Sequence, residues 1–320
     1  VCFHLTVTCA DVAESFPMVF TDEEVAQCND IRIPQMTVTP SGVLLVAQCR
    51  QANVTLPNFE KLGDDQSEAK VVKKFSADFG QTWSAMEVLT PKIGHSHGQV
   101  VYDSVHKRVL LQYQYHPSVD PEFNSTLLQA ISNDDGKTFG ESKIITPLVE
   151  RCNPTAPKNM QVGSAGAKIQ TSSGRIIFVG HAKGTGCRWY TDDGGATYTA
   201  TDPYTANEAS VAEFAPGQIY MNARGSSFSW KGNRTSFWSG DEGATFSKPA
   251  ACPIKEDDGA GCSVGLVAEP LTTNRLSRIF FSEPKGPKRF GLTIRCSQDG
   301  GRTWPFEKAV GLSTDVAAYS

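Results

Sequence analysis

The sequence lacks several features that would indicate particular classes of protein. Over its 320 residues, no apolar run reaches the length of about 18 residues that a membrane-spanning helix needs. The chain has no excess of basic residues: its formal net charge is −4, which argues against nucleic acid or an anionic membrane as a partner. No long segment has the 3.6-residue periodicity of an amphipathic helix. These absences favour a protein without a membrane span and rich in β-structure.

Metal and nucleotide motifs are also missing. None of the nine cysteines forms a Cys-x-x-Cys pair, which argues against a zinc ribbon or a thioredoxin-type site. The segment DDGKT at 134–138 lacks the upstream glycine of a phosphate-binding P-loop, and the Asp-rich turns lack the terminal Glu of an EF-hand. His95 and His97 have no evident third ligand. We therefore expect neither a metal nor an organic cofactor.

The cysteines and sequons together favour an extracellular chain. Several cysteines are compatible with disulfides, and Cys252 with Cys262 is the most local candidate pair. The chain starts at Val1 rather than Met, so we expect that an upstream segment has been removed. Three Asn-x-Ser/Thr sequons would suit secretion: Asn53, Asn124 and Asn233. The sequence thus predicts a secreted or lumenal glycoprotein.

One octet returns five times along the chain. Ser or Thr, then Asp, Gly, Thr and an aromatic residue recur in the same frame, in octets that start at residues 76, 132, 191, 239 and 297. Between the octets the sequence consists of short β-rich runs such as RVLLQYQY and GRIIFVGHA, separated by Gly, Pro, Asn or Asp. A repeat of about 50 to 60 residues with about four strands each is typical of a β-propeller.

The octets themselves are predicted to be scaffold. Asp can accept backbone hydrogen bonds, Gly can adopt a positive φ, and the terminal aromatic ring can pack into the sheet. Because these residue types do not vary from repeat to repeat, a structural turn explains them better than a binding loop does.

The octet resembles the Asp box, or BNR repeat, of sialidases and related propellers. The resemblance implies an all-β, six-bladed propeller whose sixth blade comes from the two ends of the chain. We expect the propeller to span 20–320, after an N-terminal segment 1–19 of uncertain role, and the C-terminus to be trimmed, because sialidases continue beyond the equivalent of Ser320. The Asp box also occurs in sortilin-type receptors and in glycanases, so function depends on other residues.

The segments between the octets resemble sialidases more specifically. Arg32-Ile33-Pro34 is similar to the motif that opens sialidase propellers, although Ile31 stands where the family usually has an aromatic residue. The resemblance implies four substrate-binding arginines: Arg32, Arg50, Arg224 and Arg289. Arg295 is closer to the last octet and is expected to lie outside the site.

The same resemblance implies three catalytic residues. Tyr319 matches the nucleophile, Glu208 the base that takes its proton, and Asp65 the acid/base, with Asp64 as the alternative to Asp65. Glu213 is expected to face outward from a strand. The implied activity is that of an exo-α-sialidase, which hydrolyses terminal sialic acids from glycoproteins, glycolipids or oligosaccharides with retention of configuration.

The chemistry of sialosides explains why these residue types would be needed. The substrate carries a carboxylate on its anomeric carbon, and convergent guanidiniums bind a carboxylate through paired, charge-assisted hydrogen bonds. A carboxylate nucleophile would be repelled by that group, whereas a neutral tyrosine would not, and a Tyr nucleophile is a known exception among glycosidases. Because the pKa of a phenol is near 10, the tyrosine needs a base.

Several alternatives stay open at this stage. The chain could be a trans-sialidase or a hydrolase of a deaminated sialic acid. It could be a catalytically silent lectin that keeps the arginines to bind sialoglycans, although a lectin needs none of Asp65, Glu208 and Tyr319. It could also be a sortilin-like binding propeller, in which the arginines need not converge. Linkage preference and oligomeric state cannot be derived from the sequence.

Overall fold

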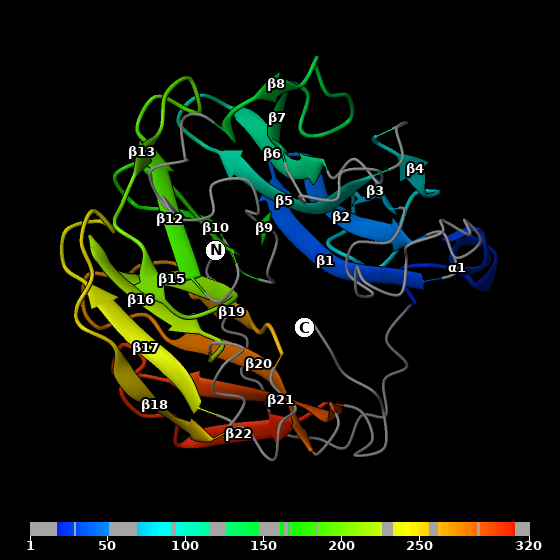
Figure 1. Cartoon of the computed structure of the whole chain (residues 1–320). Coiled ribbons are helices and arrows are strands. Elements are labelled where there is room, and N and C mark those ends of the chain that lie inside the picture. The colour runs from blue at the N-terminus through cyan, green and yellow to red at the C-terminus, as the bar shows by residue number, and fades with distance from the viewer. Residues whose placement is uncertain are drawn as a thin grey trace.

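The computed structural model describes residues 18–28, 30–50, 69–90, 94–115, 126–146, 161–162, 166, 168–182, 185–225, 233–255, 262–286 and 289–310. These residues form five antiparallel sheets and one helix, α1 (Asp22–Cys28). No helix among them is long and apolar enough to cross a membrane. The sheets follow one another in chain order around a common centre (Figure 1) and form a β-propeller.

The sheets are formed as follows. Sheet A comprises β1 (Asp30–Thr39), β2 (Gly42–Arg50), β3 (Ala69–Ser76) and β4 (Glu87–Val88). Sheet B comprises β5 (His95–Asp103), β6 (Arg108–Tyr115), β7 (Thr126–Ser132) and β8 (Lys143–Ile144). Sheet C contains β10 (Lys168–Gln170), β11 (Ile176–Ala182), β12 (Thr185–Thr191) and β13 (Thr199–Ala200); β9 (Gln161–Val162) pairs with β11 and β14 (Tyr204–Thr205) with β12.

Sheets D and E repeat the four-stranded pattern. Sheet D comprises β15 (Ala209–Ala215), β16 (Gln218–Ala223), β17 (Asn233–Ser239) and β18 (Ala250–Lys255). Sheet E comprises β19 (Gly265–Ala268), β20 (Ile279–Gly286), β21 (Phe290–Ser297) and β22 (Phe306–Ala309). The first strands of successive sheets contact one another around the centre, β1 with β5, β5 with β10, β10 with β15, and β15 with β19.

The expected propeller is confirmed, but the expected six blades are not: the described residues form five. Each of the five octets follows the third strand of one sheet, so five octets account for five sheets. The blade that was expected from the two ends of the chain falls on residues 1–17 and 311–320, which lie outside the described part.

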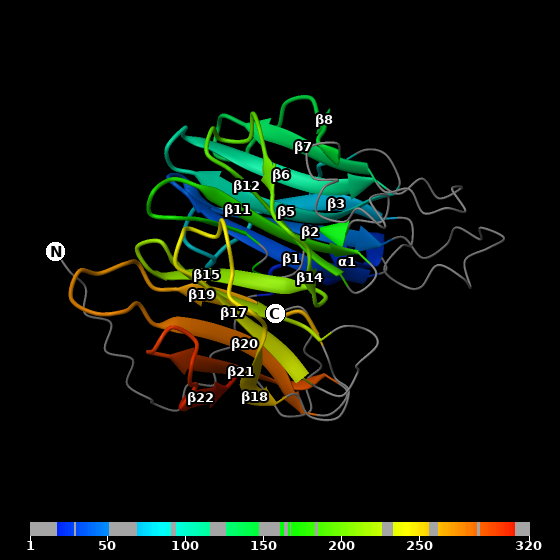
Figure 2. The same ribbon diagram turned by 60° about the vertical axis from the view of Figure 1, so that its left-hand side comes forward.

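The core lies between neighbouring sheets. Leu44 and Val46 of sheet A pack with Leu111 of sheet B, and equivalent apolar clusters lie between sheets B and C, C and D, and D and E. A further cluster covers the other face of sheet A, where Cys28 of α1 meets Leu45. Figure 2 shows sheet B at the top of the view and sheets D and E below sheet A. The interleaved apolar faces explain why strands of a propeller are apolar on both sides.

The octets are structural turns, as the sequence predicts. In sheet B, Ser132 Oγ donates to Asp134 Oδ1 (2.7 Å), and Gly136 N donates to Ser132 Oγ (2.8 Å). Thr138 donates from its backbone nitrogen to Asp134 Oδ1 (2.8 Å) and from Oγ1 to Oδ2 (2.6 Å). The same four bonds occur in the other octets, around Asp78, Asp193, Asp241 and Asp299.

The octet glycines also bring neighbouring sheets together. Gly136 has φ +88°, and a Cβ at this position would lie 2.4 Å from Leu44 Cδ2 on β2 of the preceding sheet. The equivalent glycines of sheets C, D and E meet the second strand of the preceding sheet in the same way. Glycine is therefore required both by the backbone conformation and by the close approach of the next blade.

The expectation that the chain contains disulfides is confirmed, but the candidate pair Cys252–Cys262 is wrong. Cys28 and Cys49 form a disulfide that ties α1 to β2, and Cys187 is also disulfide-bonded. Cys252 keeps its thiol, because its side chain points into sheet D, where Asn222 Nδ2 donates to Sγ (3.3 Å). Proximity in sequence did not predict the pairing, because the residues between Cys252 and Cys262 connect two different sheets.

Candidate active site

The predicted arginines and Glu208 lie at equivalent ends of their strands. In an antiparallel sheet the start of the first strand and the end of the second strand share one edge. Arg32 lies near the start of β1 and Arg50 ends β2, while Glu208 precedes β15 and Arg224 follows β16. Arg289 follows β20 in the connection to β21. These residues therefore share one end of the propeller, whereas the octets, which follow the third strands, lie at the other end.

Glu208 and Arg224 form a direct ion pair. Arg224 Nη1 donates to Glu208 Oε2 over 2.7 Å, and both side chains are about nine-tenths buried. The backbone fixes this pair, because Arg224 N donates to Glu208 O (2.8 Å) and Asn207 N donates to Arg224 O (3.0 Å). A predicted base and a predicted substrate-binding arginine thus lie next to each other, held by the β15–β16 ladder.

Arg32 and Arg50 lie together around a third residue, Asp30. Asp30 is paired directly with Arg50 between β1 and β2, and Arg32 lies two residues further along β1, on the same face. Asp30 Oδ2 is 3.7 Å from Arg50 Nη1 and 3.9 Å from Arg32 Nε. A β-bulge follows Arg32, where Ile33 adopts φ +54°, and it changes the direction of the strand.

The remaining predicted residues are placed less fully. Arg289 adopts φ +66° beside the β20–β21 hairpin, so the backbone turns sharply at the predicted position. Asp65, its alternative Asp64, and Tyr319 lie outside the described residues.

The interpretation of Glu213 as an outward-facing residue is wrong. Its side chain is 9% exposed and accepts hydrogen bonds from Ser172 N (2.6 Å), Ser172 Oγ (2.8 Å) and Gly217 N (2.9 Å). The first strand of a propeller sheet is covered by its neighbours, so a polar residue on β15 finds partners in sheet C. Arg295 forms ion pairs with Glu283 and Glu307 within sheet E.

Sequence reasoning missed two polar residues near the site. Asp30 could have been found, because residues two apart in a strand share a face and Asp30 precedes Arg32 by two. Arg234 is 1% exposed, donates to Asn222 Oδ1 (2.5 Å) and Cys262 O (2.9 Å), and lies over the ring of Phe281. It links sheet D to the segment before β19, and only the three-dimensional packing reveals that role.

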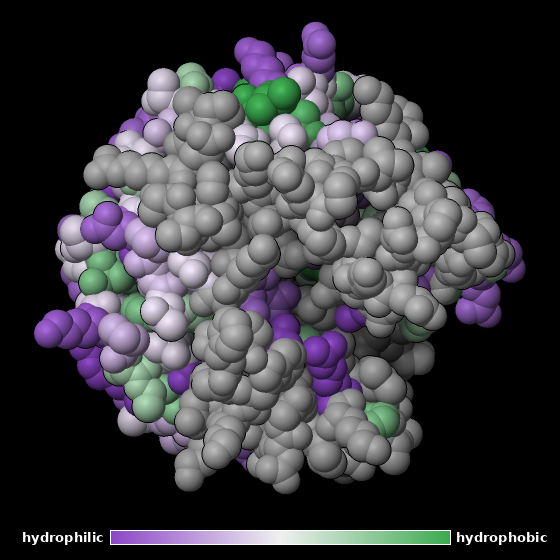
Figure 3. Space-filling view, viewed as in Figure 1, coloured by the Kyte–Doolittle hydropathy of each residue, from purple (hydrophilic) through white to green (hydrophobic). Residues whose placement is uncertain are grey.

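A groove of about 1110 Å³ lies elsewhere along the propeller. Its lining includes Gln35, Lys168 and Glu213 and the octet residues Phe79 and Gly80, and among the described residues it includes none of the predicted site residues. Burial lowers the pKa of Lys168, whose Nζ donates to Gln35, to about 7. We therefore place the candidate site at the other ends of the strands, where hydrophilic residues gather near the centre of the molecule in the view of Figure 3.

The described residues hold no evident metal site. No group of three His, Cys, Asp or Glu side chains among them lies close enough to bind an ion. His97 Nδ1 instead lies 3.0 Å from Ser96 Oγ and 2.9 Å from Gln114 Nε2, in a buried polar cluster of sheet B.

Comparisons with known proteins show which family the chain resembles. The family model for the BNR repeat-like domain matches residues 59–315. The chain is 26% identical to a sialidase of Bacteroides fragilis (strain YCH46) over 85% of the chain and 54% of that protein, and 25% identical to a sialidase of Micromonospora viridifaciens over 87% and 45%. It thus spans about half the length of the curated relatives that it matches.

A solved structure supports the fold. The NanB sialidase of Streptococcus pneumoniae superposes with a TM-score of 0.77 at 15% identity, over 97% of this chain and 66% of that one. The family model, which matches most of the chain, and the curated sialidase relatives show that the chain belongs to the sialidase family with BNR repeats.

Proposed function

We propose that this protein is an exo-α-sialidase that hydrolyses terminal sialic acids from glycans with retention of configuration. The observation that carries the proposal is the ion pair of Glu208 and Arg224, at the same end of the propeller as Arg32 and Arg50. A base next to guanidiniums, in a family that contains sialidases, is the arrangement that a carboxylate-bearing glycoside requires.

In this proposal the arginines bind the substrate's carboxylate. Each charge-assisted hydrogen bond contributes on the order of 1.5–3 kcal/mol. Arg224, already fixed by Glu208, offers a guanidinium whose position costs little further side-chain entropy on binding. Arg32, Arg50 and Arg289 would complete the cluster and so orient the anomeric carbon.

The chemical steps follow from the residue types. Glu208 takes the proton of Tyr319 as the phenol oxygen attacks the anomeric carbon, and Asp65 protonates the leaving oxygen. Asp65 then removes a proton from water, whose oxygen attacks the anomeric carbon, and the bond to Tyr319 breaks as the phenol oxygen takes its proton back from Glu208. Two displacements at one carbon restore the original configuration.

Localisation and partners are part of the same proposal. A sialidase acts on glycans outside the cell or in a lumenal compartment, and disulfides such as Cys28–Cys49 persist in an oxidising environment. We infer a secreted protein whose partners are sialylated glycoproteins, glycolipids and oligosaccharides.

The test is release of 4-methylumbelliferone from its α-sialoside by the protein and its Tyr319→Phe variant. We expect that variant to lose most turnover while it still binds a sialic-acid analogue. Tyr190→Phe is a matched control, because the Tyr190 ring lies beside Arg175 in sheet C and belongs to no part of the proposed site. Unchanged turnover in the Tyr319→Phe variant would contradict the proposed function.

The same assay separates the alternatives. Binding without turnover by the wild-type protein would indicate a lectin. Following the product by NMR in the presence of an acceptor sugar distinguishes hydrolysis from transfer, and a deaminated substrate that reacts faster than the N-acylated one would change the substrate class.

A further inference from the structure

Asp30 is a carboxylate that none of the proposed catalytic steps uses, yet it lies between two of the substrate-binding arginines. Its Oδ2 is 3.7 Å from Arg50 Nη1 and 3.9 Å from Arg32 Nε. The Asp30 side chain is half exposed, whereas the side chains of Arg50 and Arg32 are 8% and 24% exposed. Asp30 is therefore the most solvent-exposed of the three side chains, so an anion that reaches the two guanidiniums from solvent also meets the charge of Asp30.

The distances from Asp30 to Arg32 and Arg50 are longer than the distance at which Glu208 holds Arg224 in place. Arg224 is fixed by Glu208 at 2.7 Å, the length of a charge-assisted hydrogen bond. At 3.7 and 3.9 Å, Asp30 is too far from either guanidinium for a hydrogen bond of ordinary strength, so its interaction with these pairs of atoms is mainly electrostatic. A carboxylate in this position supplies charge to both arginines but does not fix the direction of either.

We propose that Asp30 is an affinity-determining residue, which competes with the substrate's carboxylate for Arg32 and Arg50. The inference rests on the proposed function in that it takes the ligand to be a sialic acid. When the ligand binds, two carboxylates share the same two guanidiniums and repel each other. The site consequently binds its substrate and the released sialic acid more weakly than the arginines alone would allow, and the product leaves more readily.

The test compares Asp30→Asn with Asp192→Asn. Both substitutions remove one negative charge from an aspartate that faces arginine, but Asp192 pairs with Arg175 in sheet C. We expect Asp30→Asn to lower the Kd of N-acetylneuraminic acid, measured by calorimetry, roughly three- to fivefold, as expected for the loss of a partly exposed charge contact. The KM for the fluorogenic sialoside should fall with it, and Asp30→Glu should keep the wild-type Kd. Asp192→Asn should change neither.

The expected gain also depends on Arg50. In an Arg50→Gln background, Asp30→Asn should tighten binding less than in the wild-type background, because one of the two shared positive charges is gone. A purely structural role for Asp30 predicts the opposite sign, since loss of a supporting contact would weaken binding and raise KM. An unchanged or higher Kd in Asp30→Asn therefore overturns the inference.

Failure of the proposed function would be seen separately. If the wild-type protein binds no sialic acid, the proposed function is wrong, and inorganic sulfate then takes the place of the ligand in the same comparison. Tighter sulfate binding by Asp30→Asn would support competition at Arg32 and Arg50, and equal or weaker sulfate binding would overturn it.

Discussion

Glu208 Oε2 accepts a hydrogen bond of 2.7 Å from Arg224 Nη1, and the two residues flank the β15–β16 hairpin ladder that joins their backbones. The backbone hydrogen bonds at this end of β15 and β16 therefore position both side chains. In the proposed function the arginine binds the anion and the carboxylate takes the proton of the phenol, and the structure holds the two side chains next to each other in a mostly buried position.

The variant Glu208→Gln tests whether Glu208 acts as the base. The amide keeps the size of the carboxylate and can still accept from Arg224, but it cannot take a proton from Tyr319. We expect kcat to fall by about 10²- to 10⁴-fold while the Kd of sialic acid changes little. Steady-state kinetics and calorimetry measure the two quantities.

The matched control is Glu213→Gln, on the same strand. Glu213 accepts three hydrogen bonds from Ser172 and Gly217, so its substitution should lower stability and leave kcat nearly unchanged. Equal losses of kcat in the two variants would show that Glu208 acts only through folding.

The Cys28–Cys49 disulfide should stabilise the edge of the site. It ties α1 to β2 one residue before Arg50 and spans 21 residues of chain. The double variant Cys28→Ala/Cys49→Ala should lose roughly 3 kcal/mol of unfolding free energy, as expected for a loop of this size. Urea unfolding measures the loss. Cys296→Ser, at a half-buried free cysteine, should not produce it. A double variant as stable as the wild type would contradict this prediction.

Sequence and structure agree where the signal is local and repeated. The octets predict their own turns, because the four hydrogen bonds that define the turn, among Ser132, Asp134, Gly136 and Thr138, lie within seven residues. The strand ends likewise place Arg32, Arg50, Arg224 and Glu208 at one edge, because hairpin connectivity follows from strand order.

The predictions from sequence are wrong where a residue makes its contacts with a neighbouring sheet. Glu213 looks like a solvent-facing strand residue until β15 is covered by Ser172 of sheet C. Cys252 and Cys262 are close in sequence, but Cys252 points toward Asn222. Neither packing relationship is encoded in local spacing, and the number of blades depends on chain ends that carry no octet.

Because of the octet aspartates, the free energy of unfolding should decrease as the pH becomes acidic. Hydrogen bonds from Thr138 and Ser132 lower the pKa of Asp134 to about 2, and bonds from Thr82 and Ser76 do the same for Asp78. A carboxylate whose pKa is lower in the folded state contributes stability above its unfolded value, near 4, and this contribution is lost as the pH falls through the folded value. The urea midpoint should therefore fall between about pH 4 and pH 2.

Asp134→Asn tests the origin of this slope. The variant should be less stable than the wild type at pH 7 and should lose less stability between pH 4 and pH 2, because one titrating carboxylate is gone. Asp202→Asn, at an exposed side chain of the β13–β14 connection, should keep the wild-type slope. Identical slopes for Asp134→Asn and the wild type would show that the acid transition originates elsewhere.

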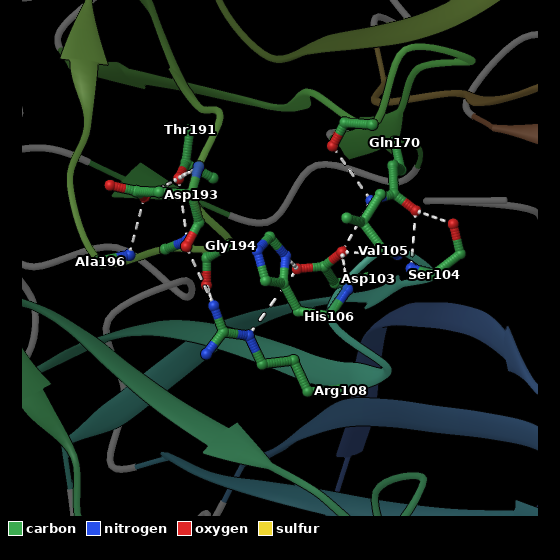
Figure 4. A network of polar contacts seen from close by, with 12 residues as sticks. Asp103, Ser104, Val105, His106, Arg108, Gln170, Thr191, Asp193, Gly194 and Ala196 are labelled. Atoms are coloured by element: carbon green, nitrogen blue, oxygen red, sulfur yellow. Dashed lines mark hydrogen bonds and ion pairs between the residues drawn. The ribbon is translucent and has the colours of Figure 1, made fainter.

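Asp103 should couple the stability of sheet B to that of sheet C. It is fully buried at the end of β5, where its carboxylate contacts His106 Nδ1 (2.7 Å) and accepts from Gln170 Nε2 of sheet C (2.9 Å). Arg108, 3.7 Å from the same carboxylate, donates to the carbonyl oxygens of Asp193 and Gly194 in the octet of sheet C (Figure 4). Burial opposes ionisation of Asp103, but the hydrogen bonds from His106 and Gln170 outweigh it and lower its pKa.

Asp103→Ala should therefore cost about 3–5 kcal/mol of unfolding free energy, because it leaves His106 and Gln170 without their shared hydrogen-bond partner and Arg108 without its nearby negative charge. Asp103→Asn should cost less, since an amide oxygen can still accept from Gln170. Urea unfolding gives both values, and hydrogen exchange shows where the loss falls: amides of β6 and of β10–β11 should lose protection together. Exchange that increases in sheet B alone would mean that Asp103 supports its own turn and does not couple the two blades.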